Sequence, residues 1–381
     1  MLKKFVSTKL SEPGFTKEHT LITKGILVIM LLAHHVFYPD NISFYGIHTI
    51  IDDYELQNDI IFFLKICISG FAFLTAYGMC RKYIRIGEDK REFLHISVVR
   101  LIKLEASVIF IYFAAVIYKK FVMGESISFL YIGEERNIFK LLVYMCVDML
   151  GLAEFAGIVR MNITWWYLSL FIVLIAILPF IFLIYKKYRY LCLPVFLLMP
   201  FLAINSLREV LPSVCLGIAF SYENWFEKLG NKKVKNKFIG LVISLCIFYL
   251  AYLLRPFANM MFTYTLAFII PYMVYDVISY IPVISHCLKF LGKHSMNIFL
   301  THTFIYLYFH PDFIYSFRNS WTILSVLLGL SLLVSIVIEI FKKITGYNKL
   351  VSKLIALVDD KWAEIHKGET MDADHRNIKA G

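Results

Sequence analysis

Two side chains near the start of the chain, Lys24 and His35, have the types and the spacing of a catalytic pair on one helix. The residues between Lys24 and His34 are all apolar. Eleven helical steps of 100° return to within about 20° of three whole turns and rise about 16 Å, so Lys24 and His35 share one face. His34 points about 80° away from Lys24 on the same helix. We therefore predict that His35, and not His34, belongs to a polar line that begins at Lys24.

An ammonium group at one end of such a line suits an anion, and an imidazole at the other end suits proton transfer near neutral pH. The alternative is that Lys24 only reaches water at a membrane boundary, with the histidines near the opposite interface. The residues of this stretch alone leave both interpretations open.

A third histidine, His302, lies seven residues after Ser295, so the two side chains share one face of a helix. His302 falls near the middle of an apolar stretch. A histidine in that position either serves a function or hydrogen-bonds a neighbouring helix. We favour a functional role, and we expect Ser295 and His302 to belong to the same site.

Arg100 and Lys103 are three residues apart and are therefore neighbours on a helix surface. They lie at the start of an apolar stretch that ends near Tyr118. The pair is either ordinary positive charge at the cytoplasmic boundary or a binding site for the phosphates of an anionic cosubstrate.

An aromatic segment, from Asn162 through Trp166 and Tyr167, precedes another apolar stretch. Paired Trp and Tyr residues at a membrane boundary usually form an aromatic belt. The functional alternative is that they form a wall for a sugar or an acyl group, with Asn162 beside them.

These candidates lie in a chain with the composition of a membrane protein. The sequence is 59% hydrophobic and 17% aromatic, its mean hydropathy is +0.68, and apolar stretches of about twenty residues recur along it. The formal charge of +11 does not indicate nucleic acid, because in a membrane protein the position of each Lys and Arg matters more than their sum. The seven cysteines have neither metal-ligand nor disulfide spacing, so we expect no metal site.

We predict an all-α, polytopic integral membrane protein with about ten transmembrane helices and with cytoplasmic N- and C-termini. Most of the 39 Lys and Arg residues then lie on the cytoplasmic side. Residues 138–158 carry Asp148 and Glu154, and we interpret them as an external re-entrant or interfacial helix. The domain 1–343 is followed by a short polar cytoplasmic tail, 344–381, which is too small to bury a core of its own. The expected spans are 21–38, 60–80, a third that follows the basic loop 81–103 and ends near Tyr118, 164–185, 190–206, 209–222, 237–254, 261–281, 294–310 and 320–341.

The order of these motifs resembles the membrane acyltransferase 3 family, bacterial enzymes that O-acylate surface glycans and related acceptors. The most specific family motif is a first-span Arg followed, after ten residues, by a His. Lys24 and His35 occupy these positions here, and lysine keeps the charge of Arg without its bidentate fork. The other similar segments are Phe71–Gly78, with Thr75 and Ala76 in place of Ser-Gly, the pair Arg100 and Lys103, Trp166–Leu168, Leu216–Phe220 and Leu291–His302.

The resemblance implies transfer of an acyl group, most often acetyl, from cytoplasmic acyl-CoA to a hydroxyl of an extracytoplasmic carbohydrate or similar acceptor. It implies a multi-pass protein of the bacterial cytoplasmic membrane. Lys24, Arg100 and Lys103 would hold the CoA phosphates and His35 would act as the base. His302 would orient the acceptor, stabilise the oxyanion or carry a transient acyl group. We expect Asn162, Trp166, Tyr167 and Ser295 to bind substrate.

Two other classes of function stay open. One is a proton-coupled transporter or flippase of a sugar or amphiphile, in which the intramembrane histidines relay protons with Asp148, Asp276 and Glu339. The other is an inactive relative that serves as a structural subunit.

Overall fold

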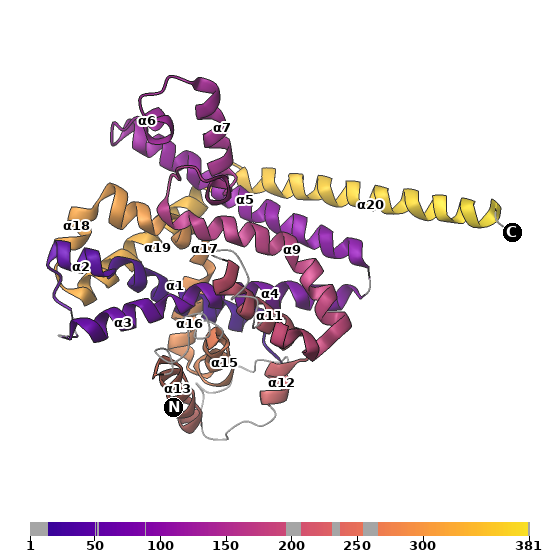
Figure 1. The fold of residues 1–381 in the computed structure, drawn as a ribbon, viewed down its shortest axis with the longest axis horizontal. Coiled ribbons are helices and arrows are strands. Elements are labelled where there is room, and N and C mark those ends of the chain that lie inside the picture. The colour runs from indigo at the N-terminus through magenta and orange to yellow at the C-terminus, as the bar shows by residue number, and fades with distance from the viewer. Residues whose placement is uncertain are drawn as a thin grey trace.

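The protein is all-helical in the part of the chain that the structure describes. The computed structural model describes residues 14–49, 51, 53–87, 89–195, 207–230, 237–253 and 266–379. Across these ranges the only extended pairing is a single isolated bridge between His48 and Asn319. Most helices form one bundle, and the C-terminal helix projects from it (Figure 1). The predicted all-α class is therefore confirmed.

Five helical stretches within the described ranges are long and apolar enough to cross a membrane. These stretches indicate a membrane protein. The predicted total of ten spans and the cytoplasmic termini stay predictions, because parts of 190–206, 237–254 and 261–281 lie outside the described residues. The five stretches are Lys17–Val36 (α1), Tyr54–Ile86 (α3, Tyr54–Leu64, and α4, Ile66–Ile86), Lys90–Phe121 (α5), Ile163–Val195 (including α9, Trp166–Tyr188) and Ser320–Ile344 (α19).

The remaining helices complete the bundle and its periphery. They are α2 (Pro39–Tyr45), α6 (Ile127–Ile132), α7 (Ile138–Met149), α8 (Ala153–Ala156), α11 (Leu207–Tyr222), α12 (Trp225–Gly230), α13 (Lys237–Leu253), α15 (Ile269–Asp276), α16 (Pro282–Lys293), α17 (Ser295–Thr303), α18 (Pro311–Tyr315) and α20 (Tyr347–Lys379).

Helix α1 lies at the centre of the bundle and contacts α3, α4, α15, α16, α17 and α19. It begins with a capping box in which Thr16 and His19 exchange hydrogen bonds. Its closest approach is to α16. A Cβ atom at Gly25 would clash with the backbone carbonyl of Leu288, and one at Gly292 would clash with that of Leu21. Two glycines thus let the backbones of α1 and α16 touch, and this contact sets the position of Lys24 and of α17.

The helix that carries His302 changes its winding directly after the histidine. α17 ends at Thr303 and continues as a π-helical segment, Phe304–Phe309. Such segments widen the helix and are frequent at functional sites. The predicted span 294–310 therefore exists as a helix, with an irregular second half.

Residues 127–156 form a small lobe of short helices at one end of α5 (Figure 1). Helix α7 has 12 residues and a length of about 18 Å, so it cannot cross a hydrocarbon core of about 30 Å. Asp148 is buried there, and its Oδ2 atom accepts hydrogen bonds from the Tyr131 hydroxyl (2.5 Å) and the Met161 backbone N–H (2.6 Å). Burial raises the pKa of the Asp148 carboxyl. The side of the membrane on which the lobe lies stays a prediction.

The predicted polar tail is largely one helix, α20, which packs along α5. The Tyr347 hydroxyl donates to the Ala106 carbonyl at 2.8 Å. Further along, the His95 ring nitrogen Nε2 lies 2.8 Å from Asp359 Oδ1, and the same ring stacks on Trp362. The tail is therefore anchored to the helix that carries Arg100 and Lys103.

Candidate active site

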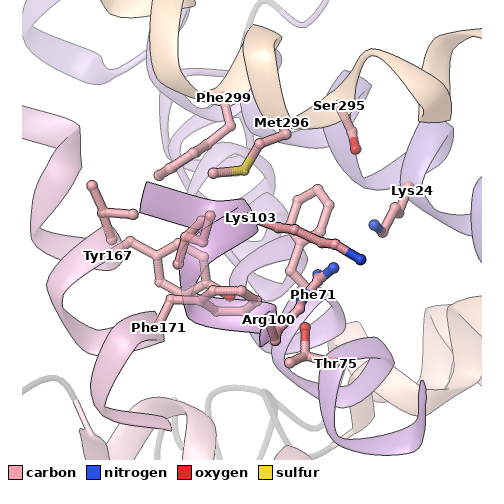
Figure 2. A pocket seen from close by; sticks show the side chains of 12 residues that line it. Lys24, Phe71, Thr75, Arg100, Lys103, Tyr167, Phe171, Ser295, Met296 and Phe299 are labelled. Atoms are coloured by element: carbon pink, nitrogen blue, oxygen red, sulfur yellow. The ribbon is translucent and has the colours of Figure 1, made fainter. Parts of the chain in front are cut away.

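A cavity of about 170 Å³ lies where α1, α4, α5, α9 and α17 meet. The structure brings Lys24 together with Arg100 and Lys103 in its wall, although Lys24 lies far from that pair in the sequence. Figure 2 shows their nitrogen atoms on one side of the cavity, while Tyr167 and Phe171 lie on the other. The full lining is Lys24, Phe71, Thr75, Arg100, Lys103, Leu104, Tyr167, Leu168, Phe171, Ser295, Met296 and Phe299.

The three cations make this cavity electropositive. Within the described part of the chain, none of Lys24, Arg100 and Lys103 forms an ion pair with a carboxylate, whereas Lys65, Lys119 and Lys342 do. Unpaired cations around one concave surface attract anions and raise their local concentration. The arrangement suits a ligand with several phosphate groups.

A second, much smaller cavity of about 10 Å³ lies next to the first, on the side of His35. Phe71, Tyr167 and Phe299 line both cavities and therefore separate them. We call these three side chains the aromatic partition. The Tyr167 hydroxyl is fixed by donating to the Ile68 carbonyl at 3.0 Å. The small cavity has room for about one water molecule, and its other walls are Leu31, His35, Ile68, Thr164 and Trp166.

The two adjacent histidines of α1 have different surroundings. His34 is buried, and its Nδ1 atom donates to the Ile61 carbonyl at 2.7 Å. His35 lines the small cavity and has no hydrogen-bond partner among the described residues. Its ring lies 5.3 Å from the His302 ring, centroid to centroid, with 40° between the planes. His35 is thus the histidine with nitrogen atoms available to a substrate.

Some predicted site residues do not line either cavity. His302 and Asn162 are both 0% exposed and lie behind the cavity wall. Asn162 caps a short 3-10 turn, Ile163–Trp165, by accepting from the Thr164 backbone N–H. In the next helical turns Trp166 reaches the small cavity and Tyr167 reaches both. Ser295 lines the larger cavity beside Lys24.

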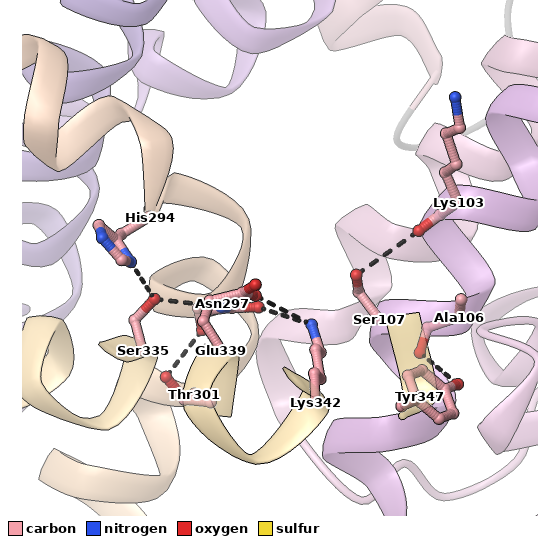
Figure 3. Close-up of polar contacts among 10 residues, drawn as sticks. All are labelled: Lys103, Ala106, Ser107, His294, Asn297, Thr301, Ser335, Glu339, Lys342 and Tyr347. Atoms are coloured by element: carbon pink, nitrogen blue, oxygen red, sulfur yellow. Dashed lines mark hydrogen bonds and ion pairs between the residues drawn. The ribbon is translucent and has the colours of Figure 1, made fainter. Parts of the chain in front are cut away.

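A polar network that was not foreseen from the sequence holds α17 against α19 (Figure 3). Ser335 Oγ lies 2.8 Å from His294 Nδ1 and accepts from Asn297 Nδ2 at 3.1 Å. Asn297 Nδ2 also donates to Glu339 at 2.8 Å, and Lys342 pairs with Glu339 at 3.2 Å. The carboxylates of Asp148, Asp276 and Glu339, which a proton relay would need, line neither cavity.

Sequence reasoning also missed a charged pair beside the aromatic segment. Lys65 Nζ lies 3.0 Å from Glu209 Oε1 and 5.7 Å from the centre of a Trp166 ring. An ion pair within apolar helices is costly to desolvate and commonly marks a functional region. The signal available in the sequence was a lysine in an otherwise apolar stretch.

Comparison with known protein families decides the class. A family model described as an acyltransferase domain matches residues 22–340. The chain belongs to the acyltransferase 3 family. The matched region of the acyltransferase includes both cavities, His35 and His302, and the three cations of the larger cavity. Helix α20 lies beyond it. As an enzyme, it transfers acyl groups other than aminoacyl groups.

No curated protein and no solved structure matched the acyltransferase. In the described part of the chain, no group of three or more His, Cys, Asp or Glu residues could hold a metal ion.

Proposed function

We propose that this acyltransferase moves an acyl group, in the first instance acetyl, from cytoplasmic acyl-CoA to a hydroxyl of an extracytoplasmic carbohydrate or similar acceptor. The observation that carries the proposal is the pair of adjoining cavities. One has three unpaired cations, and the other has a histidine without a hydrogen-bond partner among the described residues. We place the enzyme in the bacterial cytoplasmic membrane as a multi-pass protein.

The larger cavity supports the choice of donor. The phosphates of acyl-CoA carry several negative charges, and Lys24, Arg100 and Lys103 supply matching positive charge at one end of the cavity. The apolar side, with Phe171 and Met296, suits the uncharged arm that links the phosphates to the thioester. The thioester would then reach the aromatic partition on the side of His35, which lies about three helical turns from Lys24 along α1.

The smaller cavity supports the reaction step. An acceptor hydroxyl is a weak nucleophile until a base takes its proton. His35 accepts this proton while the hydroxyl oxygen attacks the thioester carbonyl carbon. The new C–O bond forms, the C–S bond breaks, and His35 returns the proton to the departing thiolate. The products are the acyl ester and free CoA.

The dimensions of the small cavity favour a short acyl group, because its room for about one water molecule leaves little space for a longer chain. Trp166 lines the same cavity, and an aromatic ring of this kind suits the apolar face of a sugar. These features support acetyl as the acyl group and a carbohydrate as the acceptor class.

The test uses the purified full chain in phospholipid vesicles with radiolabelled acetyl-CoA and a panel of glycan fragments and free sugars. We expect CoA release that depends on an acceptor, with transfer of the label to that acceptor. His35→Ala should lower kcat by about 10²-fold to 10⁴-fold, while His34→Asn, which keeps a donor for the Ile61 carbonyl, should not.

Equal label transfer by wild type and a folded His35→Ala variant would contradict the assigned base. Label that crosses the vesicle membrane without CoA release would favour a transporter instead. Mass spectrometry of surface glycans from cells with and without the gene would identify the acceptor.

A further inference from the structure

The role of His302 follows from the positions of its two ring nitrogens. Nδ1 lies 3.1 Å from the Ile298 carbonyl and 2.9 Å from the Phe299 carbonyl. Carbonyl oxygens only accept hydrogen bonds, so Nδ1 carries a hydrogen and donates to them. Nε2 lies 3.3 Å from the Thr303 hydroxyl oxygen. Both nitrogens are therefore engaged by the protein, and the ring is fully buried behind the cavity wall.

The Thr303 hydroxyl belongs to a chain of hydrogen bonds whose direction is fixed at its far end. The Thr164 backbone N–H donates to Asn162 Oδ1 at 3.0 Å, which settles which amide atom is the oxygen. The Thr164 hydroxyl must then also donate to this oxygen, at 2.7 Å. Because its hydrogen is used there, Thr164 can only accept from the Thr303 hydroxyl, 3.0 Å away.

Thr303 consequently has one hydrogen and two possible acceptors, Thr164 Oγ1 and His302 Nε2. When Nε2 carries no proton, the Thr303 hydroxyl can donate to it. When Nε2 gains a proton, the hydroxyl turns toward Thr164 and accepts from Nε2, so that every donor in the chain still has an acceptor. This change needs rotation of one hydroxyl and no movement of heavy atoms.

We infer that Thr303, Thr164 and Asn162 are positioning residues that control the protonation of His302, and that His302 acts through its ring contact with His35. The inference rests on the acyl transfer proposed above, and it excludes one of the three roles expected for His302. Neither ring nitrogen presents a free lone pair to either cavity, so His302 does not carry the acyl group. Asn162, expected to bind substrate, is assigned instead to the fixed end of the chain.

The experiment compares Thr303→Val, which keeps the shape of the side chain and removes the hydroxyl, with Thr303→Ser, which keeps the hydroxyl. We expect Thr303→Val to lower kcat by about tenfold or more and to change KM for acetyl-CoA by less than about twofold. Thr303→Ser should restore kcat to within about threefold of wild type. Thr164→Val should resemble Thr303→Val, because it removes the acceptor that lets the hydroxyl turn.

Thr301→Val is the matched control. Thr301 is a buried threonine on the same helix, and among the described residues its hydroxyl bonds only to the Asn297 backbone carbonyl, as a donor at 2.7 Å. Its kcat should stay close to that of wild type. Size-exclusion profiles in detergent should be the same for all variants.

Two results would overturn the inference in an active wild-type enzyme. The first is a kcat for Thr303→Val equal to that of Thr301→Val, or a Thr303→Ser variant as impaired as Thr303→Val. The second is radiolabel from acetyl-CoA that stays bound to denatured wild-type protein and disappears in His302→Ala. A wild-type enzyme that transfers no acyl group would instead contradict the proposed function.

Discussion

At the scale of single residues, the cation at position 24 is the clearest departure from the family motif. Lys24 shares its cavity with Arg100, which has the bidentate fork that lysine lacks. We expect Arg100→Ala to raise KM for acyl-CoA by about tenfold or more. Lys24→Arg should lower KM by a smaller factor, because it adds a second fork to the same anion site.

Steady-state kinetics with varied acetyl-CoA provide the measurement. Arg81→Ala is a suitable control, because Arg81 is a half-buried arginine that donates to Asn224 and does not line the cavity. If Arg100→Ala leaves KM unchanged while Lys24→Arg lowers kcat, the phosphates bind elsewhere.

The buried carboxyl of Asp148 makes stability depend on pH. Burial raises the pKa of this group in the folded protein, so the folded state disfavours the charged form. Its contribution to stability is therefore fully present below the unfolded pKa of about 3.9 and is lost as pH rises through the folded pKa. Asp148→Asn keeps an oxygen that can accept from Tyr131 and Met161.

We expect Asp148→Asn to have a higher thermal midpoint than wild type at about pH 7.5, and this advantage to shrink toward about pH 4. Thermal unfolding followed by tryptophan fluorescence at both pH values checks this. An advantage of equal size at both pH values would show that the effect comes from something other than ionisation.

The sequence predicts the parts of the site whose residues lie close together along the chain. Helical arithmetic over eleven residues is enough to predict that Lys24 and His35 share one face. The three-residue spacing of Arg100 and Lys103, with their match to a family motif, is enough to single out this pair. Thr303 was not foreseen, because a threonine beside a histidine is ordinary in sequence. Its importance comes from the packing of 162–165 against α17.

At the scale of helices, the contact between α1 and α16 fixes the site. The Cβ atom of an alanine at Gly292 would meet the Leu21 carbonyl, and backbone cannot move aside as a flexible side chain can. We expect Gly292→Ala to destabilise the protein by about 1–3 kcal/mol and to lower kcat, because the two helices position Lys24 and Ser295.

Gly329→Ala in α19 is the control, since a Cβ atom there meets no atom within 4 Å. It should be neutral or stabilise the protein by up to about 1 kcal/mol. Thermal unfolding and acetyl transfer should be measured for both variants. If the two variants had equal thermal midpoints and equal acetyl transfer, α1 and α16 would be able to move apart at little cost in free energy.

For the helices too, the sequence predicts local features but not contacts between distant residues. Long apolar stretches such as 320–341 are predictable from length and hydropathy alone, and α19 matches that range closely. The docking of α20 on α5 was not predictable, because its contacts, such as His95 with Trp362, join residues far apart in sequence. The polar composition of the tail does not indicate a packing partner.

At the scale of the whole molecule, we expect the matched domain to act without the C-terminal helix. All residues of the proposed site lie within 22–340, and α20 follows it. We expect a chain that ends at Gly346 to keep kcat within about threefold of wild type and to have a lower thermal midpoint, because it loses the contacts of Tyr347 and Trp362 with α5. Radiolabel transfer and thermal unfolding of both proteins check this.

A truncated protein that unfolds at the wild-type temperature would show that α20 adds no stability. A truncated protein that is well folded but inactive would show that the tail is needed for the reaction. Trp362→Ala in the full chain is the milder control, since it removes one contact and leaves the helix.

The aromatic partition has a consequence beyond the chemistry of acyl transfer. The proposed reaction, with its donor and acceptor on opposite sides of a membrane, would need polar groups along a path through the bilayer. A continuous file of water along that path would conduct protons and dissipate the electrical potential that the cell maintains. Phe71, Tyr167 and Phe299 interrupt the path between the two cavities. If donor and acceptor meet from opposite sides of the membrane, as proposed above, we expect these rings to limit such a file of water.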